Sequence, residues 1–225
     1  NSLSIALVPS ISEAEAKGDV RLVHYRIHQA IRISFASGAL ATIIFFLFSV
    51  PILTYMYGTS NASKYIVLMA PFFLFLYIQA PLQSALFALD LAKFAMWNSL
   101  IGSVVKFIVL VIFASNQQFG IIGVAIAIST SVVLITFLHL ATLWKAIDFS
   151  IPKKDVFKMI LLVSITYFAG YLLKLLFGER FDHLLILISI FMILTFIYLL
   201  LVILLRFMTK DELKQIPYLN KFFKN

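Results

Sequence analysis

The sequence predicts an all-α protein, a polytopic bundle whose helices cross a membrane about six times. Of its 225 residues, 62% are hydrophobic and only 12% are charged, and the mean hydropathy is +1.03. A soluble domain of this size is far less apolar. Long apolar segments account for most of the chain, and about 20 apolar residues are enough to span the hydrocarbon core of a bilayer.

The stretch from Trp97 to Ser131 shows the pattern clearly. It places two apolar runs back to back, separated by a polar turn at residues 115–118. Lys106 is the only formal charge between Lys93 and Lys145. A run of this length is expected to form two consecutive crossings.

Six spans are predicted from the apolar runs and the polar turns between them. They cover residues 33–57, 65–89, 92–114, 121–143, 156–177 and 184–205. We expect five regions in order: the end of an upstream span with a basic cytoplasmic helix, a cavity-forming four-helix part, a cytoplasmic loop, two peripheral helices and a basic tail. Their ranges are 1–32, 33–144, 145–158, 159–205 and 206–225.

The first region is expected to contain two short structural signals. Residues 3–8 are apolar and stop at Pro9, as the last turns of an upstream span would. We therefore interpret the sequence as the C-terminal part of a longer membrane protein. The Ser-x-x-Glu pattern at residues 10–13 predicts a helix from Ile11 to Gly18, and Asp19 is expected to cap the next helix. A similar pattern at residues 209–212 predicts a short helix in the tail, stopped by Pro217.

Small residues four apart predict close helix packing. Gly38 lies on such a face of the first span, and Gly123 and Ala127 lie on one in the fourth span. Gly102 belongs to the third span. Small side chains let two membrane helices approach closely, so these four residues are candidate packing positions.

The third span carries a polar stripe. Ser99, Gly102, Ser103 and Lys106 recur at intervals of three and four, so they share one helix face. An intramembrane cation marks a candidate functional site, and the stripe is expected to face other helices or a wet cavity. The alternative is that the long stem of Lys106 carries its ammonium to the interface.

The second span contains Pro71 and Pro81, which are expected to bend it. Gln79 and Gln83 flank Pro81, and Asp90 follows seven residues after Gln83. These three side chains are further candidates for the lining of a substrate cavity. The alternative is that the amides hydrogen-bond backbone carbonyls freed by Pro81.

The sequence offers no constellation for catalysis, a metal or another cofactor. It contains no cysteine and no His-Glu-x-x-His motif, and no carboxylate lies inside a predicted span. His24 and His28 are four residues apart, but without a third ligand nearby a solvated helix face is the favoured interpretation. His139 lies near an interface and is interpreted as a solvated residue. We predict a protein that is not an enzyme.

The basic residues predict the orientation in the membrane. Fourteen of the 18 Lys and Arg residues lie on one side of the predicted spans and three lie on the other. By the positive-inside rule both ends of the chain are then cytoplasmic. Because these residues sit in short loops, we expect them to contact anionic lipid headgroups and not nucleic acid.

Four segments carry a family resemblance. They are Val8 to Ala14, Asn98 to Gly102 with Lys106, Gly120 to Ala125, and Lys210 to Leu213 with Pro217. In order and spacing they resemble the C-terminal half of the stage V sporulation protein B group. That group comprises polysaccharide-biosynthesis membrane proteins of the multidrug/oligosaccharidyl-lipid/polysaccharide exporter superfamily.

The resemblance implies a fold and an activity. Members have fourteen transmembrane helices in two lobes around a central cavity. Related lipid II flippases move an undecaprenyl-pyrophosphate-linked sugar across the bacterial cytoplasmic membrane by alternating access. This chain would then supply the end of helix eight and helices nine to fourteen, with a missing N-terminal lobe as partner and two outer helices to guide a polyprenyl tail. A multidrug or ion-coupled antiporter of the same superfamily is the alternative, although it usually needs carboxylates inside the membrane.

Overall fold

The computed structural model describes residues 2–116, 118–177, 184–205 and 207. Within these ranges the secondary structure is entirely helical. The helices are α1 (Ser2–Ala16), α2 (Val20–Tyr57), α3 (Ser63–Ala88), α4 (Ala92–Ala114), α5 (Ile121–Ile147), α6 (Lys153–Phe177) and α7 (Leu184–Leu204). Helices α2 to α7 are long and apolar enough to cross a membrane, which confirms the six predicted spans. The helix predicted around residues 209–217 lies outside the described residues.

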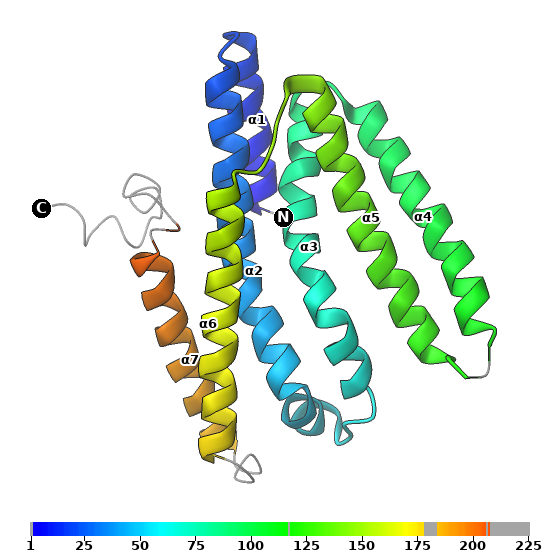
Figure 1. Ribbon diagram of the computed structural model, residues 1–225, viewed down its shortest axis with the longest axis vertical. Coiled ribbons are helices and arrows are strands. Elements are labelled where there is room, and N and C mark those ends of the chain that lie inside the picture. The colour runs from blue at the N-terminus through cyan, green and yellow to red at the C-terminus, as the bar shows by residue number, and fades with distance from the viewer. Residues whose placement is uncertain (1, 117, 178–183, 206, 208–225) are drawn as a thin grey trace, which may run out of the picture.

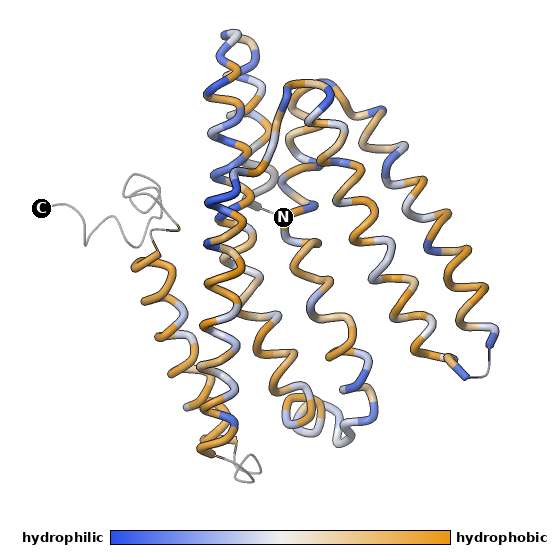
Figure 2. Tube along the Cα trace, viewed as in Figure 1, coloured by the Kyte–Doolittle hydropathy of each residue, from blue (hydrophilic) through white to orange (hydrophobic). Residues whose placement is uncertain are grey.

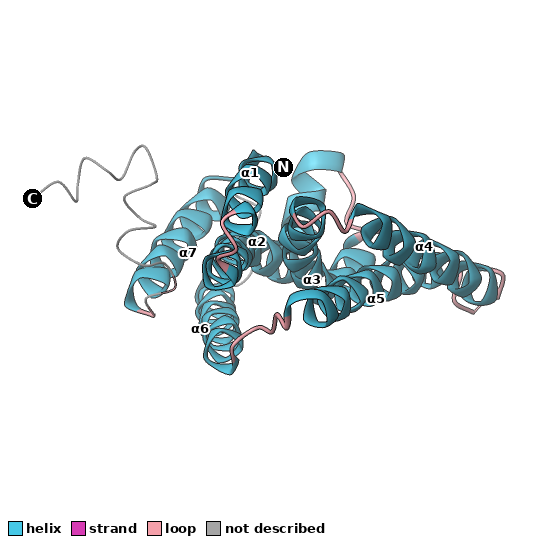
Figure 3. Ribbon diagram, turned by 90° about the horizontal axis from the view of Figure 1, so that it is seen from above, coloured by secondary structure: helices cyan, strands magenta, loops and turns pink. Residues whose placement is uncertain are grey.

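The helices form an elongated bundle with α2 and α3 at its centre (Figure 1). On one side of this pair, α5 packs against α3 and α4 packs against α5. On the other side, α6 packs against α2 and α7 packs against both. Seen along the helix axes, α4 therefore lies on one side of the bundle and α6 and α7 lie on the opposite side (Figure 3).

Polar residues concentrate towards the two ends of the helices, and apolar residues fill the length between them (Figure 2). This distribution is the one that a bilayer requires, because its core offers no hydrogen-bond partners to polar groups. The tyrosines at the end of α2, Tyr55 and Tyr57, are exposed. Exposed tyrosines at a helix end are typical of the membrane–water interface.

Helix α1 differs from the prediction, because it runs through Pro9 without a break and does not begin after it. A proline inside a helix removes one backbone hydrogen bond but does not always end the helix, particularly in membrane proteins. The hydroxyl of Ser12, inside the Ser-x-x-Glu pattern but not one of its two capping residues, donates to the carbonyl of Ala88 at 3.0 Å. Ala88 is the last residue of α3, so Ser12 satisfies a carbonyl that the helix end leaves free.

Helix α2 is a single helix of 38 residues that begins well before the apolar run. The carboxylate of Asp19 accepts from the Leu22 backbone N–H at 3.0 Å, as the sequence predicted for this cap. The helix departs from helical geometry only at Phe48, where φ is −120° and ψ is 21°. Pro51 follows three residues later, so α2 has a straight part and a bent end.

The connection between α5 and α6 is held against the first turns of α2. It comprises residues 148–152 and is shorter than the predicted loop, because helices extend into residues 145–158 from both sides. His24 Nε2 lies 2.8 Å from the carbonyl oxygen of Ile147, and the rings of His24 and His28 pack against Phe149. Arg32 forms an ion pair with Asp155 at 3.5 Å. The predicted basic helix is therefore joined to α5 and α6.

Candidate functional site

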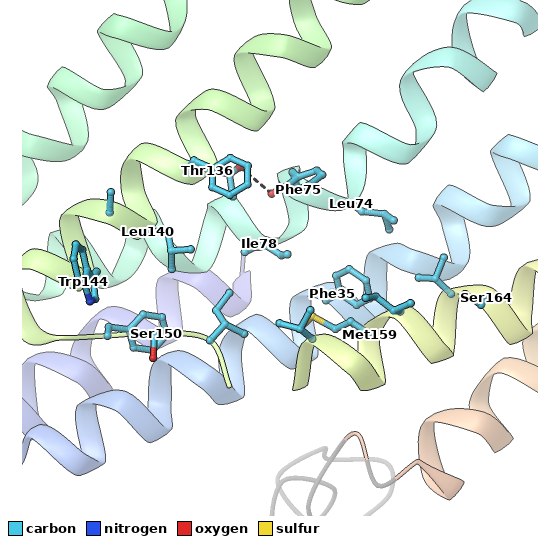
Figure 4. Close-up of a pocket in the computed structure, with 17 residues that line it drawn as sticks. Phe35, Leu74, Phe75, Ile78, Thr136, Leu140, Trp144, Ser150, Met159 and Ser164 are labelled. Atoms are coloured by element: carbon cyan, nitrogen blue, oxygen red, sulfur yellow. Dashed lines mark hydrogen bonds between the residues drawn. The ribbon is translucent and has the colours of Figure 1, made fainter. Parts of the chain in front are cut away.

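A large apolar groove runs between the centre of the bundle and α6 (Figure 4). Its volume is about 780 Å³. Helices α2, α3, α5 and α6 and the α5–α6 connection all contribute to it. The side chains that define it are mainly aromatic and aliphatic, and they include Phe35, Ile78, Leu140, Trp144, Met159 and Val163.

The groove exists because α5 and α6 diverge after their short connection. Phe149 is buried in that connection. Beyond it, α5 packs against α3 and α6 packs against α2. The hydroxyl of Thr136, one of the few polar groups at the groove, donates within α5 to the carbonyl of Val132 at 2.7 Å. It also lies 3.3 Å from the carbonyl oxygen of Phe75. The surface is therefore suited to an apolar chain and offers little to a polar ligand.

Gly102 of the polar stripe of α4 lies in the contact with α5, whereas the polar side chains of the stripe lie beside that contact. The buried residues of α4 are Ala95, Asn98 and Gly102, whereas Ser103 and Lys106 are exposed. The hydroxyl of Ser99 donates to the carbonyl of Ala95 at 3.0 Å. None of the three side chains of the stripe lines the apolar groove. The stripe borders a helix face that the described residues leave open.

The candidates on α3 and at its end are spread over about three turns. Gln79 and Gln83 are half-buried, and Asp90 is exposed in a left-handed conformation with φ of 56°. The side-chain amide oxygen of Gln79, Oε1, is shielded from solvent and has no hydrogen-bond partner among the described residues. Neither amide donates to a backbone carbonyl in that part of the chain. The structure does not gather these three side chains and the α4 stripe into one pocket.

The four candidate packing residues all lie at helix contacts. A methyl group built on Gly38 would lie 2.2 Å from ring atoms of Tyr77, and one on Gly102 would lie 2.2 Å from Ile135. Gly123 faces the backbone of Phe113 and Ala114. Ala127 is fully buried. The carbonyl of Gly102 also accepts from the hydroxyl of Ser131 at 3.0 Å, which ties α4 to α5.

A buried polar cluster between α4 and α5 was not predicted. The Asn98 amide nitrogen lies 2.9 Å from the hydroxyl oxygen of Thr142 and 3.1 Å from Nδ1 of His139. The interpretation of His139 as a solvated residue was wrong, because the side chain is fully buried. Distance from the helix end predicts depth in the membrane, but burial depends on which neighbour covers the residue. The sequence did contain one indication of this cluster. Asn98 and Gly102 are four residues apart, so they share one face of α4, and Gly102 was already a candidate packing residue.

The two histidines of α2 have no third metal ligand beside them in the part of the chain that the structure describes. Among the described residues, no group of three or more His, Asp and Glu side chains is arranged to hold a metal ion. His24 instead contacts the end of α5. The pair therefore acts in the packing of the α5–α6 connection.

Comparison with known proteins identifies the family. The model of the family described as lipid II flippase MurJ matches residues 1–196. The chain belongs to this family. It is 39% identical to stage V sporulation protein B of Bacillus subtilis (strain 168) over 220 residues. This alignment covers 98% of the chain and 42% of that relative. The chain is 30% identical over 151 residues to sporulation protein YkvU of the same organism, covering 67% of the chain and 34% of the relative.

Membership of the MurJ family confirms the resemblance that the four segments carried. The chain spans less than half the length of the two curated relatives. No solved structure matches it. With six apolar helices and this family, the protein is a multi-pass membrane protein.

Proposed function

We propose that this chain is the C-terminal part of a flippase that moves a polyprenyl-pyrophosphate-linked saccharide, a cell-wall precursor, across the bacterial cytoplasmic membrane. The observation that carries this proposal is the apolar groove, together with membership of the MurJ family. The substrate has two chemically opposite parts, a long hydrocarbon tail and a charged head. A protein that moves it needs separate surfaces for the two.

The tail is assigned to the groove beside α6. Its walls are aromatic and aliphatic side chains from four helices, with few polar groups. A hydrocarbon chain in this groove gains close van der Waals contact, which drives association inside a bilayer in place of the hydrophobic effect. The tail can stay in the groove while the head crosses.

The head is assigned to a cavity between this chain and the missing N-terminal lobe. The open face of α4 carries Ser99, Ser103 and Lys106, and Gln79, Gln83 and Asp90 complete the proposed lining. Lys106 is the only formal charge between Lys93 and Lys145, so it would attract the pyrophosphate. Alternating access by the two lobes then exposes this cavity to each side in turn.

An ion-coupled antiporter is the weaker candidate. Such a protein needs a carboxylate that binds and releases an ion inside the membrane. All ten Asp and Glu residues of the chain lie outside the six apolar segments. The flippase proposal requires no intramembrane carboxylate in this part of the protein.

The direct test uses the full-length protein in liposomes. A polyprenyl-pyrophosphate-linked saccharide carrying a fluorophore on the sugar should become accessible to a membrane-impermeant quencher only when the protein is present. Translocation of a cationic drug under an ion gradient, without movement of the labelled lipid, would contradict the proposal and favour the antiporter.

Filling the groove should slow transport severalfold. Ser164 lines the groove from α6, and Ser164→Trp places a bulky ring where the tail would lie. The effect should be partial, because the displaced tail finds an equally apolar environment in the lipid. Lipid flipping by the full-length variant in liposomes measures it. Phe168→Trp is the matched control, since Phe168 is exposed on the same helix and lies outside the groove; an equal loss in both variants would contradict the assignment.

Both ends of the chain are proposed to be cytoplasmic, on the basis of the 14 to 3 distribution of basic residues. Single cysteines at Ser60 and Asn116 should react with an impermeant thiol reagent added to intact cells. A cysteine at Ser150 should react only after the membrane is opened. The chain itself contains no cysteine, so it contributes no background labelling. The reverse labelling pattern would invert the orientation.

A further inference from the structure

A second, smaller pocket lies at the bent end of α2, which is the end opposite to the Asp19 cap. Its volume is about 420 Å³, and it lies between α2 and α6. Its lining residues are Leu47, Phe48, Val50, Pro51, Thr54, Tyr55 and Lys174. The pocket is separate from the apolar groove, with which it shares no lining residue.

The position of Lys174 follows from the chemistry of the bend. Pro51 has no backbone N–H, so the carbonyl of Leu47, four residues earlier, lacks the donor that an ordinary helix supplies at this position. The ammonium of Lys174 donates to this carbonyl at 3.1 Å from the neighbouring α6. This hydrogen bond uses one of the three N–H donors of the ammonium.

The charge of Lys174 is not neutralised within the described part of the protein. The two ion pairs found there join Lys17 to Glu13 and Arg32 to Asp155. The ammonium is therefore fixed at the edge of a pocket with donors to spare. A single negative charge placed there would be attracted and hydrogen-bonded.

The pocket offers both apolar and polar contacts. Leu47, Phe48 and Pro51 supply apolar side chains, and the ammonium of Lys174 lies at the Leu47 carbonyl. Thr54 lies three residues beyond Pro51. The hydroxyl of Thr54 donates to the carbonyl of Val50 at 2.9 Å, so its oxygen can still accept from a ligand hydroxyl. Tyr55 and Tyr57 at the same helix end are exposed, which places the pocket at a membrane–water interface.

We propose that this pocket binds an anionic phospholipid that carries a hydroxylated headgroup, such as phosphatidylglycerol. The phosphate diester lies against Lys174, a headgroup hydroxyl donates to Thr54, and the start of an acyl chain lies against Leu47 and Pro51. A phosphodiester carries one negative charge, which matches the single cation, whereas a pyrophosphate would bring more charge than the pocket neutralises. The site is thus distinct from the transport pathway, and its occupant joins the bent end of α2 to α6.

The test compares lipids bound to the full-length protein in nanodiscs made of phosphatidylcholine with a small fraction of phosphatidylglycerol. Native mass spectrometry counts the phosphatidylglycerol molecules that stay bound. Lys174→Met should weaken retention of one such lipid about fivefold, which corresponds to the contribution of one basic residue to binding an anionic membrane lipid. Lys174→Arg should retain it, because the charge and the donors persist. Lys64→Met is the matched control, since Lys64 is exposed in the first turn of α3, which follows the end of α2 after a short turn.

Lys174→Gln separates the charge from the hydrogen bond to Leu47. It keeps an N–H donor but has no charge, so it should lose the lipid as Lys174→Met does while melting near the wild-type temperature in nanodiscs without phosphatidylglycerol. Wild-type retention of phosphatidylglycerol by either variant would overturn the proposal. Equal retention of phosphatidylcholine and phosphatidylglycerol by the wild type, or an equal loss in Lys64→Met, would also overturn it.

Discussion

Lys106→Met in the full-length protein should abolish transport while leaving the amount of folded protein unchanged. Methionine keeps most of the stem volume of lysine and removes only the charge. The side chain is exposed on α4, so no packing within the described residues depends on its ammonium. If the ammonium pairs with a pyrophosphate in a water-poor cavity, its loss should weaken binding by at least about thirtyfold. Genetic complementation and lipid flipping in liposomes measure the effect.

Two comparisons make this result specific to the charge. Lys106→Arg should keep part of the activity, because a guanidinium keeps the charge but has a planar shape. Ser115→Ala, in the exposed turn that ends α4, should transport normally. If Lys106 instead extends to the interface, Lys106→Met should be tolerated or stabilising. Removing a charge from a lipid-facing helix relieves an insertion cost, which is about 2.5 to 3.5 kcal/mol at the membrane centre and smaller near the interface. Normal complementation by that variant would remove the role of Lys106 but not the family assignment.

Gly123→Val should destabilise the bundle more than the same change at Gly38. A Cβ atom on Gly123 would lie 2.6 Å from the Phe113 carbonyl carbon and 2.7 Å from the Ala114 nitrogen. These are backbone atoms of α4, so the two helices must separate to make room. Overpacking of this kind costs about 1 to 3 kcal/mol. A thermal melt of the purified protein in detergent should show a lower transition temperature.

Gly38 provides the informative contrast. Its nearest neighbours are the Cγ and Cδ atoms of the Tyr77 ring, which a change of the Tyr77 χ1 angle can move, whereas the α4 backbone moves only with the helix. Val124→Leu is the control for Gly123→Val, because Val124 is the next residue on α5 and is exposed. A Gly123→Val variant that melts at the wild-type temperature would show that α4 and α5 are not tightly packed there.

Apolar runs predicted the membrane helices well because both features have the same cause, the exclusion of polar groups from the bilayer core. The third span was predicted at residues 92–114, and α4 has those bounds. The beginning of α2 could not be predicted from hydropathy, since the helix starts at Val20, well before the apolar run. Hydropathy marks where a helix is in lipid, whereas Asp19 marks where the helix begins. Pro9 was misinterpreted because a proline weakens a helix without always ending it.

The candidate sites were harder to predict because they depend on pairs of helices. Spacing placed Ser99, Ser103 and Lys106 on one face of α4, but it contains no information on what that face contacts. The pairing of Asn98 with His139 joins residues 41 positions apart. Lys174 and Leu47 are 127 positions apart. The sequence does indicate that Pro51 leaves the Leu47 carbonyl without a donor, but only the packing of α6 on α2 identifies the donor.

The length of α2 has a mechanical consequence. Its 38 residues correspond to about 57 Å of helix, nearly twice the thickness of the hydrocarbon core. From Val20 to Leu47 the helix is an unbroken rod, so a force on its basic end is carried into the membrane as a tilt of the whole rod. At Phe48 the rod ends in a joint, and the last turns can keep their orientation while the rest rotates. A push received at the basic end is thereby transmitted through about three quarters of the helix and absorbed at the joint before it reaches the other end.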